Sequence, residues 1–225
     1  MFIICIINIL QFAQKLIIII GKTEIPDEDL MAEMYEISVS ILKEAGFDRY
    51  EVSNFAKYDA AESRHNKTYW NGLQYIGIGP GAHSRVVSLE NLTLNKVHDS
   101  TFSSKSFIRE ARINVPDPAN WLTEINKKGN GIKKITKQNR QDVLCEFIST
   151  AMRTKTGIES HMWNIFCPSL TLPEAFEGKI DSFQDSGLLI LTEKNLTATS
   201  RGLNILDYLL PYLLNIVCDN KLIYD

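Results

Sequence analysis

The stretch that decides the fold spans residues 50–86 and reads YEVSNFAKYDAAESRHNKTYWNGLQYIGIGPGAHSRV. Alternating residues predict a strand over 49–55, and an apolar run predicts a second strand over 73–78. The second strand is closed by a turn with three alternate glycines, Gly77, Gly79 and Gly81. Between the strands lies a loop-like segment that carries an imidazole, an amide and two large aromatic rings, in His65-Asn66-Lys67-Thr68-Tyr69-Trp70.

A helix is predicted upstream of this stretch, over residues 27–45. Asp27 can cap its first turn, Glu28 and Asp29 suit the positive end of the helix dipole, and Gly46 ends it. Apolar residues repeat at helical spacing and form one stripe, at Leu30, Met34, Ile37, Ile41 and Ala45. Helix, strand, loop and strand in this order indicate an α/β layer.

A second module is predicted nearer the C-terminus. It consists of helices over 141–154 and 173–184, a β-hairpin from Gly187 that turns near Lys194-Asn195, and an apolar helix over 201–217. Helix, helix, hairpin and helix is a winged-helix arrangement, but a net charge of −3 argues against binding to nucleic acid. The basic run over 125–141, which lacks acidic residues, is interpreted as a solvated linker rather than an anion site.

The cysteines and the apolar start exclude several classes of protein. Cys5, Cys145, Cys167 and Cys218 lie too far apart in the 225-residue chain for a CxxC zinc site or a CxxxCxxC iron–sulfur loop. No disulfide framework is indicated, so a reducing compartment is expected. Residues 1–20 are apolar but carry Asn8, Gln11, Gln14 and Lys15, so we expect no stable membrane span there.

Several segments together carry a resemblance to a known family. They are PDEDLMAEMYEISVSILKEAGFDRYEVSNFA (26–56), SRHNKTYW (63–70), YIGIGPGAHSR (75–85), REARINVPDPANW (109–121), MRTKTG (152–157) and DSGLL (185–189). On these residues the chain resembles the HemW family of radical S-adenosylmethionine (SAM) proteins, called radical S-adenosylmethionine domain-containing protein 1 in animal mitochondria. The HNxxYW element at 65–70 separates this family from its relatives, the oxygen-independent coproporphyrinogen III oxidases.

The resemblance implies an α/β fold class, the C-terminal part of a partial (β/α) radical-SAM barrel followed by a mostly helical winged-helix-like domain. It assigns the remaining barrel elements to residues 1–86 and an irregular connecting segment to 87–117. The winged-helix-like domain, of the type found in HemN, is assigned to 118–225. Barrels of this kind hold their ligands at the C-terminal ends of the strands.

The resemblance also implies a haem-binding chaperone that delivers haem to client haemoproteins of the respiratory chain, mitochondrial in a eukaryote and cytoplasmic otherwise. Family members hold a [4Fe-4S] cluster through CxxxCxxC and bind S-adenosylmethionine beside it. This chain lacks that motif, so we expect a C-terminal portion of the family that assembles no cluster and is not catalytic by itself. The alternatives are a radical-SAM enzyme of porphyrin biosynthesis, similar to coproporphyrinogen III oxidase, and a fragment without function.

The resemblance places haem at the HNxxYW element. His65 would ligate the iron, Asn66 would orient its imidazole, and Tyr69 and Trp70 would pack against the porphyrin. The alternative is that the first two residues only fix the loop and the aromatic pair fills the core. The glycines at 77, 79 and 81 would either approach S-adenosylmethionine closely or form a tight turn. His83, just past that turn, is the second candidate for the haem ligand.

Overall fold

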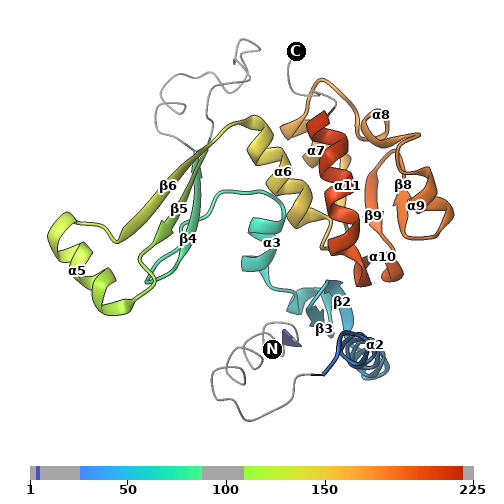
Figure 1. The fold of residues 1–225 in the computed structure, drawn as a ribbon, viewed down its shortest axis with the longest axis horizontal. Helices are drawn as coiled ribbons and strands as arrows, with labels where there is room; N and C mark the ends of the chain where they lie inside the picture. Colours follow the sequence, from blue (N-terminus) through green and yellow to red (C-terminus); the bar gives the residue numbers. More distant parts are fainter. Residues whose placement is uncertain (1–3, 6–25, 88–108, 220–225) are drawn as a thin grey trace.

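The computed structural model describes residues 4–5, 26–87 and 109–219, and their strands form antiparallel sheets of three strands each (Figure 1). The strand orders are β1-β3-β2, β4-β5-β6 and β7-β9-β8. Most of the apolar start, residues 6–25, and the weakly patterned residues 88–108 lie outside the described residues. The prediction about a membrane span over 1–20 therefore stays a prediction.

The first sheet follows the predicted helix, which forms as α2 over Glu28–Glu44 with the Asp27 side chain accepting a hydrogen bond from Leu30 N at 2.8 Å. The single strand predicted over 49–55 is wrong. Two short strands form instead, β2 (Asp48–Glu51) and β3 (Asn54–Ala56), and they pair antiparallel, with β1 (Ile4–Cys5) on the far edge of β3. The chain reverses because the Glu51 carboxylate accepts from Ser53 N at 2.8 Å, which closes the turn.

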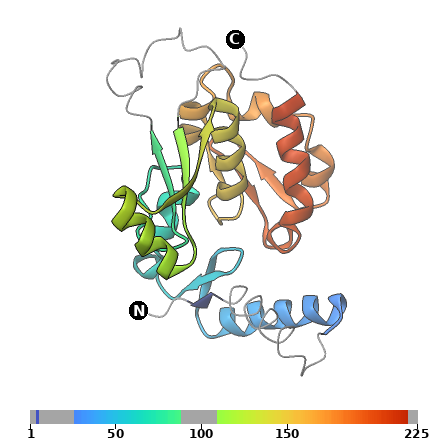
Figure 2. The same ribbon diagram turned by 60° about the vertical axis from the view of Figure 1, so that its left-hand side comes forward.

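The apolar stripe of α2 is exposed. Leu30, Met34, Ile37 and Ile41 keep between 44% and 59% of their surface accessible, and no residue of α2 is buried. The helix lies beside β2, at the lower edge of the molecule in the view of Figure 2. The described residues therefore cover its stripe only in part.

The segment expected to be a loop around HNxxYW is helical. A short 3-10 helix, η1 (Asp59–Ala61), leads into α3 (Arg64–Trp70), where the Ser63 hydroxyl accepts from Asn66 N at 3.2 Å as the N-cap. The strand predicted after it, over 73–78, is wrong. Only Tyr75 bridges to Arg85, while side-chain bonds from Val87 N to Gln74 Oε1 and from Gly77 N to Ser84 Oγ replace the ladder.

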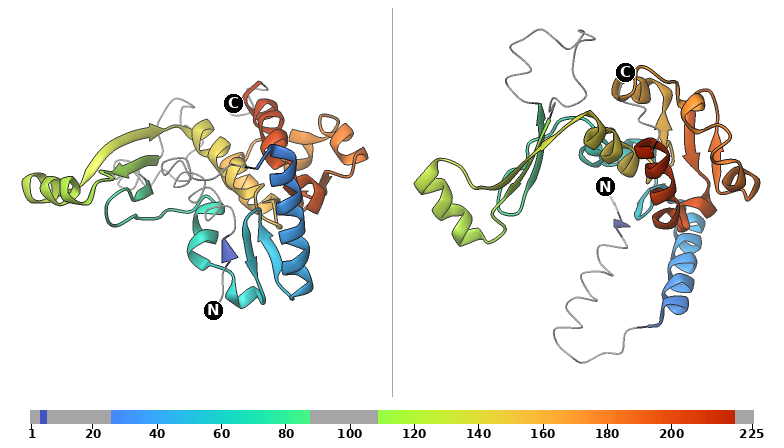
Figure 3. Two further views of the ribbon diagram at one scale, coloured as in Figure 1. Left: turned by 60° about the horizontal axis from the view of Figure 1, so that its bottom comes forward. Right: turned by 45° about the horizontal axis from the view of Figure 1, so that its top comes forward.

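The second sheet extends away from the C-terminal helices and carries α5 (Pro118–Lys128) at its far end (Figures 1 and 3). It consists of β4 (His83–Val87), β5 (Arg109–Asn114) and β6 (Ile132–Gln138). The prediction of an irregular segment over 87–117 is thus wrong for β5, and that of a linker over 125–141 is wrong for α5 and β6. The basic run includes β6, an edge strand whose residues from 133 to 137 are all exposed. Its lysines are typical of an edge strand as well as of a linker. Because the sheet joins parts of all three predicted domains, the domain division stays a prediction.

The C-terminal module holds the main core. Its elements are α6 (Arg140–Ala151), β7 (Ile158–Glu159), α7 (Ser160–Phe166), α8 (Leu172–Phe176), α9 (Asp181–Asp185), β8 (Leu189–Leu191), β9 (Asn195–Ala198), α10 (Ser200–Asn204) and α11 (Leu206–Asp219). The predicted hairpin is confirmed as β8–β9. The predicted apolar face of α6 is buried, as expected, at Val143, Leu144, Phe147 and Ile148, and so is Met152 directly after the helix. None of the helices in the described ranges has the length and apolarity needed to cross a bilayer.

Two predicted helices of this module are each divided in two. The helix predicted over 173–184 breaks between α8 and α9, where Gly178 adopts a φ of 74° that favours glycine. The helix predicted over 201–217 breaks at Ile205, which ends α10 with φ −118°. In both cases the apolar periodicity continues across the break, so the pattern alone gave one long helix.

Candidate functional site

Helix α3 presents His65 and Tyr69 together. They lie four residues apart and so share one face, and their rings meet edge-on with centroids 5.0 Å apart. The His65 side chain is exposed, while Tyr69 is half-buried. The Tyr69 hydroxyl donates a hydrogen bond to Asn66 Oδ1. Asn66 therefore orients the phenol, and the phenol ring contacts the imidazole. The role predicted for Asn66, orienting the imidazole, stays a prediction.

A line of polar contacts anchors Asn66 to the rest of the protein. Its Nδ2 donates to Asn54 Oδ1 at 3.5 Å, and Asn54 Nδ2 donates to the buried Glu51 carboxylate at 2.7 Å. Arg153 Nε donates to the other oxygen of Glu51 at 2.8 Å. The position of the His65 face is thus fixed through β2 and β3 to the loop after α6.

Trp70 lies behind this face. It is 7% exposed and packs against Tyr50, with ring centroids 5.8 Å apart, and its carbonyl accepts from Thr150 Oγ1 of α6 at 3.2 Å. Its indole also meets Tyr69 edge-on with centroids 6.2 Å apart. Trp70 therefore supports Tyr69 from the core side, which is the role the alternative interpretation assigned to it.

The glycine turn is explained by contacts within the chain. A Cβ at Gly77 would lie 2.1 Å from the His83 carbonyl oxygen, so the closest approach at this position is to the protein's own backbone. Gly79 and Gly81 adopt φ of 102° and 69°, which a side chain disfavours. His83 is exposed at the start of β4. The turn thus needs no ligand to account for its glycines.

A charged cluster that the sequence did not reveal joins the second sheet to α6. Arg109 is 4% exposed and donates from Nε to Gln138 Oε1 at 2.9 Å, and its Nη2 lies 3.1 Å from Glu146 Oε1. Arg85 Nε donates to the same carboxylate at 2.7 Å. Burial opposes ionisation of Glu146, but hydrogen bonds from Arg85 and Gln138 and the Arg109 charge outweigh it and lower the pKa of Glu146. These partners are far apart in sequence, so no local pattern could identify them.

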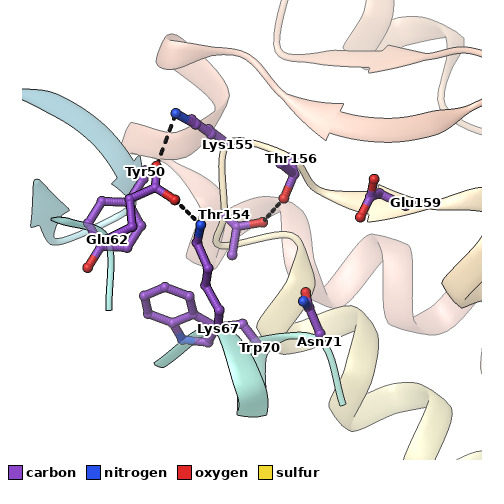
Figure 4. Close-up of a pocket in the computed structure, with 9 residues that line it drawn as sticks. All are labelled: Tyr50, Glu62, Lys67, Trp70, Asn71, Thr154, Lys155, Thr156 and Glu159. Atoms are coloured by element: carbon purple, nitrogen blue, oxygen red, sulfur yellow. Dashed lines mark hydrogen bonds and ion pairs between the residues drawn. The ribbon is translucent and has the colours of Figure 1, made fainter. Parts of the chain in front are cut away.

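A pocket opens on the other side of α3 (Figure 4). It is lined by Tyr50, Glu62, Lys67, Trp70, Asn71, Thr154, Lys155, Thr156 and Glu159. Lys67 and Trp70 lie roughly 140–200° around the helix from His65, so the pocket and the imidazole do not meet. Its volume of about 190 Å³ is below the roughly 300–1,000 Å³ of ordinary ligand sites. Both lysines pair with the Glu62 carboxylate, Lys155 at 3.2 Å, so these groups join α3 to the loop after α6.

The described residues do not fit an iron–sulfur cluster. No group of three or more His, Cys, Asp or Glu side chains converges among them in a way that could hold a metal ion. Cys167 is buried in the core, while Cys145 and Cys218 lie together between α6 and α11. Three converging thiolates, which such a cluster needs, are not present in this part of the chain.

The fold is similar to part of the fold of one solved structure. The coproporphyrinogen III oxidase HemN from Escherichia coli, a radical SAM enzyme, superposes with a TM-score of 0.53 over 85% of this chain and 42% of its own, at 12% identity. This likeness concerns the fold alone, since the identity is low. No model of a protein family matches the sequence.

Proteins with similar sequences carry two related names. The chain is 38% identical over 196 residues to the mouse protein radical S-adenosyl methionine domain-containing protein 1, mitochondrial, a match that covers 86% of this chain and 41% of the relative. It is 42% identical over 77 residues to the heme chaperone HemW of Bacillus subtilis, covering 34% of this chain and 20% of that protein. The chain is thus a homologue of the HemW and radical SAM domain-containing protein 1 family. It spans about two fifths of the length of the curated relatives that it matches along most of its sequence.

Proposed function

We propose that this chain binds haem at the His65 face of α3 and hands it on to other proteins. The single observation that carries the proposal is the exposed His65 imidazole, held edge-on against Tyr69, whose hydroxyl is in turn fixed by Asn66. Imidazole is a common axial ligand of haem iron, and a ligand held in one orientation loses less freedom on binding. Asn66, Tyr69 and Trp70 are therefore positioning residues for His65.

The surface next to this face suits a porphyrin. Tyr75 packs against Tyr69 with ring centroids 5.4 Å apart, and its backbone is fixed by two hydrogen bonds to Arg85, each 2.9 Å long. Close to Tyr75 in sequence, Ile76 and Ile78 have 77% and 88% of their surface accessible. Covering apolar surface of this kind with a flat apolar ring removes it from water, which favours binding.

A chaperone role is supported by the names of the relatives. One relative is named a heme chaperone, and others are named mitochondrial. We therefore propose mitochondrial location in a eukaryote, cytoplasmic location in a bacterium, and clients among respiratory haemoproteins. The competing proposal, a radical-SAM oxidase of coproporphyrinogen, requires a [4Fe-4S] cluster and S-adenosylmethionine, and the described residues offer no site for that cluster.

Haem transfer to an acceptor tests the proposed function. The purified chain is loaded with one equivalent of haem and mixed with apomyoglobin, and transfer is followed by the Soret band. We expect the loaded chain to give up its haem, whereas His65→Ala, carried through the same loading and gel filtration, should retain little haem to transfer. A chain that retains no haem after gel filtration would contradict the proposal. Release of 5′-deoxyadenosine from S-adenosylmethionine after anaerobic reconstitution with iron and sulfide would favour the oxidase instead.

A further inference from the structure

Two cysteines from distant parts of the chain meet between α6 and α11. Cys145 lies on α6 and Cys218 near the end of α11, separated by 73 residues in sequence, and their sulfur atoms are 3.7 Å apart. Cys218 is exposed and Cys145 is half-buried. A disulfide has a sulfur–sulfur distance of about 2.05 Å, so the two sulfur atoms must approach each other by roughly 1.6 Å to form one.

The helices that carry the two thiols are held in place by the core. Leu144 and Ile148 flank Cys145 on α6 and are fully buried, and Leu213 and Val217 of α11 are buried in the same cluster. The two sulfur atoms are therefore neighbours because of helix packing, and not because of a flexible segment. Loop closure over so many residues gives a crosslink here a large effect on the unfolded chain.

We propose that Cys145 and Cys218 form a dithiol site that low-molecular-weight disulfides convert to an intramolecular disulfide between α6 and α11. In the first step the exposed Cys218 thiolate attacks the reagent disulfide, forms a mixed disulfide and releases one reagent thiol. In the second step Cys145, after losing its proton to solvent, attacks Cys218 Sγ and releases the second thiol. Two protein thiols are oxidised and one reagent disulfide is reduced to two thiols, so atoms and electrons balance.

The order of the two attacks follows from the surroundings of the thiols. Burial, the hydrogen bond with Cys218 and the nearby Asp142 charge raise the pKa of Cys145 to about 12, so this group is a protonated thiol at neutral pH. Its thiolate, once formed, is a strong nucleophile held next to its target. Cys167 offers an internal comparison, because it is 1% exposed and burial raises its pKa as well.

The crosslink would act on the helix that supports the His65 face. Helix α6 contacts α3 through the bond from Thr150 Oγ1 to the Trp70 carbonyl, and Arg153 just after α6 pairs with Glu51. A covalent bond to α11 limits the opening of α6 and of the C-terminal helix together. The site is thus a redox-dependent crosslink within the C-terminal module, and its formation does not require that His65 binds haem.

The test uses the full chain with oxidised glutathione, followed by mass spectrometry of intact protein and of peptides. We expect a product that has lost two hydrogen atoms, a peptide crosslink between Cys145 and Cys218, and a midpoint of thermal unfolding raised by several degrees. Reduction with dithiothreitol should reverse all three changes. Cys145→Ser should stop at the glutathione adduct on Cys218, and Cys218→Ser should show neither product.

The proposal would be overturned by a wild-type chain that accumulates only glutathione adducts, or by a crosslink that involves Cys167 or a second molecule. Each variant is first checked for the circular dichroism of the parent. Should Cys145→Ser fail to fold, hydrogen exchange of the wild-type chain decides the question. The amides of α11 must then exchange more slowly after oxidation, and an unchanged exchange rate contradicts the proposed crosslink between α6 and α11.

Discussion

The Tyr69 hydroxyl donates its hydrogen bond to Asn66 Oδ1, three residues earlier on α3, while Asn66 Nδ2 reaches Asn54 of β3 at 3.5 Å. One amide thereby connects the aromatic ring beside His65 with the sheet below it. The connection continues through the Glu51 carboxylate to Arg153. His65 and Asn66 are adjacent in the HNxxYW element but differ in their contacts. His65 is exposed to solvent, whereas Asn66 connects α3 to β3.

Asn66→Ala is expected to destabilise the protein by about 1–2 kcal/mol, because it removes the acceptor of the Tyr69 hydroxyl bond and the donor to Asn54 Oδ1. Urea unfolding followed by circular dichroism measures the change. Arg64→Ala is the matched control on the same helix, since this exposed side chain should cost no more than about 0.5 kcal/mol. Equal urea midpoints for Asn66→Ala and the parent would show that the Asn66 amide does not contribute to stability.

The Glu146 carboxylate makes stability depend on pH. Burial raises the pKa of Glu146, but its hydrogen bonds with Arg85 and Gln138 and the Arg109 charge outweigh burial and hold the native pKa below the ordinary value of 4.5. A lowered native pKa contributes stability that is complete above the unfolded value and is lost as the pH falls through the native one. Unfolding free energy measured from pH 7 downward should therefore fall less steeply below 4.5 in Glu146→Gln than in the parent.

The same variant also tests the buried charge. Glu146→Gln leaves Arg109, whose side chain is 5% exposed, without its carboxylate, so a loss of about 3 kcal/mol at neutral pH is expected. Glu110→Gln on β5 is the matched control, because Glu110 pairs with a more exposed Arg112 and should cost less than about 1 kcal/mol. A Glu146→Gln protein as stable as this control would show that the cluster does not hold the sheet on α6.

Two helices with similar apolar stripes should respond differently to the same substitution. Ile148→Ala on α6 removes a fully buried side chain and should cost about 2–5 kcal/mol. Ile41→Ala on α2 changes a residue that is 59% exposed, and its cost should stay within about 0.5 kcal/mol. Chemical unfolding of both variants checks the difference. A cost at Ile41 similar to that at Ile148 would mean that the α2 stripe is covered in solution.

These helices also show what the sequence can and cannot predict. Periodicity located both α2 and α6 and the faces that are apolar, because spacing along a helix is a local property. Whether a stripe is buried depends on what packs against it, so α2 and α6 looked alike before the structure was known. The β8–β9 hairpin was predictable for the same local reason, with turn residues between two short apolar runs.

Other features depend on contacts that no local pattern records. The pairing of β5 with β4 and β6 brings together residues from three predicted segments. The lysines of the exposed β6 gave this strand the composition of a linker. The Arg109–Glu146 cluster depends on that pairing. At the candidate site, the resemblance named His65, Asn66 and Tyr69, and their part in haem binding stays a proposal. Their contacts with one another depend on the helical conformation of α3, where a loop had been predicted.

Haem titration of histidine variants tests the proposed role of His65 most directly. The parent chain, His65→Ala, His83→Ala and His161→Ala are titrated with haem, and the Soret band gives the dissociation constants. Loss of the iron ligand should weaken binding by about a hundredfold, or about 2.7 kcal/mol, in His65→Ala alone, with a shifted Soret maximum. The variants at the exposed His83 and His161 should match the parent. Equal dissociation constants and spectra for His65→Ala and the parent would contradict haem ligation by His65.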